Sequence, residues 1–149
     1  MKIVIKIFIL ILFFNNSIFT QETNLKKGDL KEVSELINKG NYDKAVVILK
    51  KISLERKNTE DVVDIKTLLG IAFLGKKDYK KAEACMQEVL DKKPDLIIPN
   101  YILALIYEFK KEYEKSLIFW KKVYQLSEEE RFKEMVEKHI HQLKILLKE

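Results

Sequence analysis

Apolar residues recur every three or four positions along most of this 149-residue chain, with charged residues between them. This spacing places an apolar stripe along one face of each helix, so it predicts helices rather than strands. The stripes and the polar breaks between them predict seven helices, over about residues 29–37, 42–57, 59–74, 79–91, 99–110, 112–126 and 128–148.

Polar residues and prolines mark several of the expected helix ends. Asp29 with Glu32, and Ser127 with Glu130, have the spacing of reciprocal capping boxes. Pro99 is suited to a first helical turn, where its missing amide hydrogen is not needed. The chain has only 4 Gly and 2 Pro, which agrees with a mostly helical fold.

A tyrosine followed three residues later by a small residue occurs three times along the chain. The pairs are Tyr42 with Ala45, Tyr79 with Ala82, and Tyr113 with Ser116, at intervals of 37 and 34 residues. A period near 34 is typical of stacked helical hairpins. Gly70 and Ala104 stand twelve residues before the second and third small residues. Two helices approach closely where both carry small side chains, so we expect the helices to cross there.

This pattern resembles the tetratricopeptide repeat over about residues 26–127, most closely in LLGIAFLGKKDYKKAEACMQEVLDKKPD. The resemblance implies an all-α fold, a right-handed α-solenoid of about three hairpins at residues 26–58, 63–96 and 97–127. A C-terminal helix over residues 128–149 is expected to cap the exposed end of these repeats, which occupy residues 21–127. The first repeat departs from the pattern, because Val33 takes the small position and three extra residues near Asn58 are expected to lengthen a loop.

The N-terminal segment differs from the rest of the chain. Lys2 and Lys6 are its only charges, an apolar run covers residues 7–14, and Asn15 follows that run. Residues 1–20 therefore have the features of a signal peptide, and their apolar run is shorter than a typical membrane span requires. We expect a periplasmic or secreted protein. The alternative is an uncleaved segment that anchors the chain to the inner membrane.

Charge and reactive residues point to no enzyme, cofactor or metal. The net charge of +5 includes two lysines of residues 1–20, so the remaining chain carries +3, spread too evenly to indicate nucleic-acid binding. Cys85 is the only cysteine and has no adjacent base. His139 and His141 are two residues apart on a helix, whereas helical metal ligands are four apart. Trp120 is expected to lie in the core.

The resemblance also implies where a partner would bind, because the first helix of each hairpin lines a concave groove in this family. Some members hold a carboxylate there with basic residues. The corresponding positions here carry Leu30, Ser34, Leu68, Ile98 and Ile102, so that clamp is absent. The groove is expected to be apolar, with Tyr101 and Phe109 as anchors on one helix face. Its lining would be Leu68, Ile71, Leu74, Ile98, Tyr101, Ile102, Leu105 and Phe109.

Two functions are compatible with such a groove. The first is a non-enzymatic adaptor or scaffold of the cell envelope that binds a helix or peptide of a partner protein. The second is a structural subunit in which self-association of the chain fills the groove. An exposed apolar groove of this size is unusual on a monomer, so both predict that something covers it.

Overall fold

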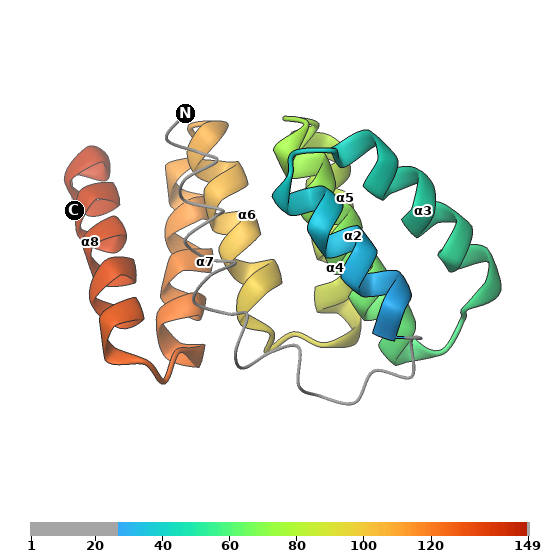
Figure 1. Cartoon of the computed structure of the whole chain (residues 1–149). Helices are drawn as coiled ribbons and strands as arrows, with labels where there is room; N and C mark the ends of the chain where they lie inside the picture. The colour runs from blue at the N-terminus through green and yellow to red at the C-terminus, as the bar shows by residue number, and fades with distance from the viewer. Residues whose placement is uncertain (1–26, 149) are drawn as a thin grey trace.

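The computed structural model describes residues 27–148, which form seven α-helices and, within that range, no strand (Figure 1). The helices are α2 (Lys27–Asn38), α3 (Tyr42–Glu55), α4 (Thr59–Gly75), α5 (Tyr79–Lys92), α6 (Ile97–Phe109), α7 (Tyr113–Leu126) and α8 (Glu130–Leu147). All seven predicted helices are therefore confirmed, with ends that differ from the expected ones by one or two residues.

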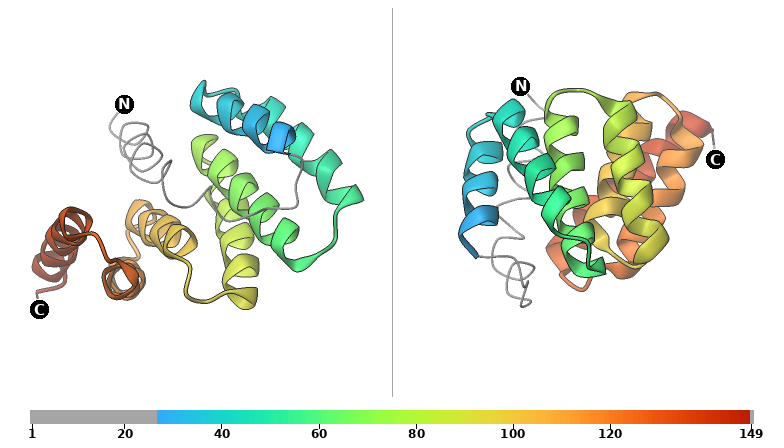
Figure 2. Two further views of the ribbon diagram at one scale, coloured as in Figure 1. Left: turned by 60° about the horizontal axis from the view of Figure 1, so that its bottom comes forward. Right: turned by 90° about the vertical axis from the view of Figure 1, so that its right-hand side faces the viewer.

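The helices follow one another in a stack of hairpins (Figure 2). α2 and α3, α4 and α5, and α6 and α7 pack as pairs, and α8 packs against α7. Each hairpin also contacts the next one, through α3 with α4 and through α5 with α6. This arrangement is the helical solenoid that the repeat predicts, in which each unit buries its apolar face against its neighbours.

One apolar core runs through the whole stack. Leu49 of α3, Met86 of α5 and Trp120 of α7 are each fully buried within it. Val136 and Leu143 of α8 are also buried, so α8 covers the end of the last hairpin. The predictions of a buried Trp120 and of a terminal helix that caps the stack are both confirmed.

Small residues allow the two helices of a hairpin to approach closely. A methyl group added at Gly70 of α4 would lie 1.9 Å from Met86 Cε and 3.3 Å from Cys85 Cβ of α5. In the third hairpin, the buried Ser116 hydroxyl donates a hydrogen bond of 2.8 Å to the carbonyl oxygen of Ala104. The small positions inferred from the repeat are therefore the positions of closest packing.

The turn inside each hairpin has the same backbone geometry. Gly40, Lys77 and Lys111 occupy equivalent positions with φ angles of +74°, +62° and +61°. After α4, the amides of Lys77 and Asp78 donate to the carbonyl oxygens of Leu74 and Phe73. This is the hydrogen-bond pattern of a Schellman motif, in which a left-handed residue ends the helix.

The starts of α2 and α8 differ from the expected ones. α2 begins at Lys27, so Asp29 lies inside its first turn and does not precede the helix. At α8 the cap is Glu129, whose carboxylate accepts a hydrogen bond of 3.0 Å from the amide of Phe132. The predicted cap Ser127 instead donates its hydroxyl hydrogen to the carbonyl oxygen of Val123, in the last turn of α7. Ser127 lies between α7 and α8, and its hydroxyl could form a hydrogen bond with the backbone of either helix. The sequence alone does not show which of the two bonds forms.

The extra residues near Asn58 lengthen a helix and not a loop. Asn58 caps α4 by accepting a hydrogen bond of 2.8 Å from the amide of Asp61, and it donates one of 2.7 Å to the Asp61 carboxylate. α4 consequently has 17 residues, against 13 in α6.

The predicted signal peptide or anchor, residues 1–20, lies outside the described residues. Across residues 27–148, none of the helices combines the length and the apolar character needed to cross a membrane.

Candidate interaction site

The first helices of the hairpins form the inner side of the stack. α4 contacts α2 and α6, so neighbouring first helices adjoin one another as well as their own partners. α8 continues this side, because its Phe132 ring lies 6.0 Å from Tyr101 of α6 and its His139 lies near Glu108 of α6. The inner side therefore includes α4, α6 and α8 in turn.

The eight predicted groove residues divide into two groups. Ile71, Ile98 and Phe109 are partly exposed and pack against the edge of the core. The other five lie within the core, and for them the expected exposure is wrong: Leu68, Leu74, Tyr101, Ile102 and Leu105. The apolar stripe of a first helix is wide enough to face both neighbouring hairpins, so much of it is covered by the stack itself.

Tyr101 shows why the sequence misplaced one anchor. Its ring packs edge-on against Trp120 with 5.0 Å between centroids, and only 2% of the residue is exposed. Burial, with a smaller effect of the Glu108 charge, raises the pKa of the Tyr101 hydroxyl well above its usual range. Tyr101 therefore joins α6 to α7 and α8 as a core residue.

Phe109 keeps an accessible surface at the C-terminal end of α6. Its ring stacks on Tyr79 of α5 with 5.6 Å between centroids. The residue also lines an open cleft of about 210 Å³ between the third hairpin and α8. The complete lining consists of Glu108, Phe109, Tyr113, His139, Gln142, Leu143 and Leu146.

Glu108 connects three helices at this cleft. Trp120 Nε1 of α7 donates to Glu108 Oε2 over 3.3 Å, and His139 Nδ1 of α8 lies 3.5 Å from the same oxygen. The His139 ring stacks on Trp120 with centroids 4.4 Å apart and an angle of 8° between the planes. The arrangement fixes the carboxylate of Glu108, which is held from two sides.

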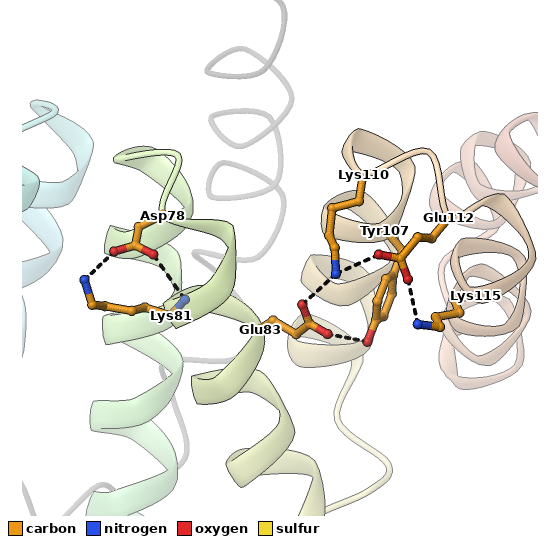
Figure 3. Close-up of polar contacts among 7 residues, drawn as sticks. All are labelled: Asp78, Lys81, Glu83, Tyr107, Lys110, Glu112 and Lys115. Atoms are coloured by element: carbon orange, nitrogen blue, oxygen red, sulfur yellow. Dashed lines mark hydrogen bonds and ion pairs between the residues drawn. The ribbon is translucent and has the colours of Figure 1, made fainter.

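A network of polar contacts surrounds Tyr107, close to the turn between α6 and α7 (Figure 3). The Tyr107 hydroxyl donates to Glu83 over 2.7 Å, and Lys110 forms ion pairs with Glu83 and Glu112. Burial and the hydrogen bond to Glu83 raise the pKa of Tyr107 to about 12. Lys110 and Lys115 lower the pKa of Glu112. These contacts join the second hairpin to the third.

The described residues contain few groups suited to catalysis. Cys85 is buried, and burial raises the pKa of its thiol, whereas a nucleophilic cysteine needs a lowered one. Asp64 also has a raised pKa, first because of burial and then because of the nearby Asp61 charge. Within residues 27–148, no group of three acidic, histidine or cysteine side chains is placed to hold a metal ion.

The repeat unit matches a known family. Residues 63–96 match the tetratricopeptide repeat. The matched segment runs from α4 through α5, the hairpin in which Gly70 and Ala82 are found. A human protein named Superkiller complex protein 3 is 32% identical over 75 residues. That alignment covers 50% of this chain but only 5% of the human protein, so the chain corresponds to a small part of that relative.

Tetratricopeptide repeats generally mediate contacts between proteins. The sequence indicated Phe109 of the cleft but missed the contribution of α8. His139, Leu143 and Leu146 were visible only as part of an apolar stripe on the last helix. The sequence pattern does not show which residues of that stripe line the cleft beside Phe109.

Proposed function

We propose that this chain is a non-enzymatic adaptor of the cell envelope that holds a helix or peptide of a partner protein on its inner side. The observation that carries the proposal is the position of Phe109, an accessible aromatic side chain in an open cleft on the side formed by first helices. Ile71 and Ile98 extend the partly exposed apolar surface along α4 and α6. Aromatic residues in such positions supply much of the affinity of protein interfaces.

The envelope location rests on residues 1–20, with their two lysines, apolar core and polar exit. Cell fractionation and N-terminal sequencing of the native protein test it. A chain that begins near Gln21 and is found in the periplasm or medium supports export. Intact Met1 on membrane-bound protein supports the anchor. Soluble cytoplasmic protein that retains Met1 contradicts both.

The binding role is tested by placing a photo-crosslinking amino acid, benzoyl-phenylalanine, at position 109 in cells. A matched control places it at position 118, because Ile118 is 64% exposed on α7, a second helix. A partner crosslinked from position 109 and not from position 118 supports the proposal. Crosslinks only between copies of this chain would favour the structural subunit whose groove is filled by self-association.

Titration of the captured partner then measures what Phe109 contributes. We expect Phe109→Ala to weaken binding about thirtyfold, equivalent to about 2 kcal/mol, and Ile118→Ala to have little effect. Because apolar contacts should dominate, affinity should change little between low and moderate salt. Strong salt dependence with an unaffected Phe109→Ala variant would mean that the lysine-rich outer surface makes the contact.

A further inference from the structure

The turns inside the hairpins lie along one edge of the stack. Figure 1 shows the turns from α2 to α3, from α4 to α5 and from α6 to α7 at the upper edge, together with the C-terminal end of α8. The connections between successive hairpins, and from α7 to α8, lie at the lower edge. The turn edge consists of residues 39–44, 76–81, 110–115 and 144–148, and the opposite edge of residues 56–60, 92–96 and 127–131.

Lysines are concentrated at the turn edge. It has eleven lysines and four acidic residues, whereas the opposite edge has five basic and five acidic residues. These segments are far apart in the sequence, so the surplus of positive charge forms only when the hairpins stack. Three of the four acidic residues already pair with lysines of the same edge: Asp43 with Lys76, Asp78 with Lys81, and Glu112 with Lys110 and Lys115.

The other lysines of the turn edge are exposed, and among the described residues they form no ion pair. They occur at every turn and at the end of α8: Lys39, Lys44, Lys77, Lys80, Lys111, Lys144 and Lys148. Their charges are therefore available to a ligand outside the chain.

Three of these lysines occupy backbone positions that favour glycine. Lys77, Lys111 and Lys148 have φ angles of +62°, +61° and +59°, and within residues 27–148 no other residue except Gly40 has a positive φ. Glycine adopts this conformation without the steric cost that a lysine side chain adds. Attraction to the helix dipole offsets part of that cost. The remaining benefit of a lysine at these three helix ends is the charge that it exposes.

The type and placement of the charges indicate the kind of ligand. Lysine is a flexible point charge, and these lysines lie along an edge and not inside a groove, so they suit an extended anionic surface. Arginine is better suited to paired hydrogen bonds with single phosphates, and the two arginines of the chain, Arg56 and Arg131, lie at the opposite edge. We propose that the turn edge binds the surface of a membrane that contains anionic lipids. This goes beyond the adaptor role, because it concerns another surface and another ligand.

Sedimentation of the full chain with lipid vesicles tests the proposal. One set of vesicles is phosphatidylcholine alone, and the other contains about 30% phosphatidylglycerol, which supplies the negative charge. Binding to the neutral vesicles measures any contribution of residues 1–20. The chain should bind the anionic vesicles at least about tenfold more tightly, and this difference should shrink as salt screens the charges. Equal binding to both sets would overturn the proposal.

The combined variant Lys77→Gly, Lys111→Gly and Lys148→Gly separates lipid binding from a role in stability. It should bind anionic vesicles about tenfold or more weakly, because each lysine near an anionic surface contributes to affinity. Its melting temperature should not fall, because glycine suits the left-handed backbone. Unchanged vesicle binding with a lower melting temperature would mean that these lysines serve only the helix ends, and it would overturn the proposal.

Two further variants control for net charge and for the backbone. Lys57→Gln, Lys92→Gln and Arg131→Gln together remove three positive charges from exposed positions at the opposite edge and should leave vesicle binding nearly unchanged. Lys39→Gln, Lys44→Gln and Lys80→Gln together remove three charges from the turn edge without altering the left-handed positions, and should weaken binding. Equal affinities for these two variants would contradict the assignment to the turn edge.

A DNA duplex is the alternative extended anion. Binding of a duplex as tight as that of the anionic vesicles, and equally weakened in the glycine variant, would assign the edge to nucleic acid and overturn the membrane proposal. Failure here is distinguishable from failure of the proposed function. The adaptor role is measured by crosslinking from position 109 and predicts little salt dependence, whereas vesicle binding should depend strongly on salt.

Discussion

Single small residues control how closely the helices of a hairpin approach. Ala82 of α5 is completely buried in the second hairpin, near the position where Gly70 of α4 meets Met86. Ala82→Leu should lower the free energy of unfolding by about 1–3 kcal/mol, because the larger side chain cannot fit without separating α4 and α5. Ala84→Leu is the matched control, since Ala84 is exposed on the same helix. Equal melting temperatures for the two variants would contradict the assignment of the crossing.

The hydrogen bond of Tyr107 should make the free energy of unfolding decrease at alkaline pH. Its pKa of about 12 lies above the ordinary value for tyrosine, so the folded state favours the neutral hydroxyl that donates to Glu83. This contribution is fully present below about pH 10 and is lost as the pH rises toward 12. We expect the wild-type chain to melt higher than Tyr107→Phe at pH 8, and the difference to shrink by pH 11. A difference that stays constant over that range would exclude the hydrogen bond as its source.

At the scale of the helix, α8 is attached to the third hairpin by the contact of His139 with Trp120 and Glu108. His139→Ala should loosen α8 by about 0.5–1.5 kcal/mol, the usual contribution of a stacked aromatic pair. Water should then reach the indole, and the Trp120 fluorescence should shift to longer wavelength. His141→Ala is the control, because His141 is exposed two residues further along and should change neither signal.

At the scale of the whole molecule, α8 closes the stack. A chain that ends after Ser127 would expose parts of Trp120 and Tyr101, which now pack against His139 and Phe132 of α8. Terminal units of a solenoid need a polar outer face to remain soluble, so the shortened chain should self-associate. Light scattering coupled to size-exclusion chromatography would measure this. A monomeric shortened chain with unchanged stability would mean that α8 is not needed as a cap.

Some details of the fold could not be predicted, because the same local sequence allows two structures. Lys77 and Lys111 adopt left-handed turns without the glycine that marks the equivalent turn at Gly40. Left-handed backbone is unfavourable for a lysine by itself, and only the hydrogen bonds that end α4 and α6 select it. The capping role of Glu129 was missed for a similar reason, since neighbouring Ser127 and Glu130 have the more familiar spacing.

The seven helices and the register of the repeat can be predicted from the amino-acid sequence alone. Both depend on neighbours within a few positions: apolar residues at helical spacing, and a tyrosine and a small residue that recur near every 34 residues. Which apolar residues of the first helices stay accessible depends instead on how the helices pack together. Tyr101 and Phe109 share one face of α6, yet α7 and α8 cover the first and leave the second in an open cleft. The burial of a side chain depends on where the neighbouring helices end and on their relative orientation. The spacing of residues along one helix does not contain that information.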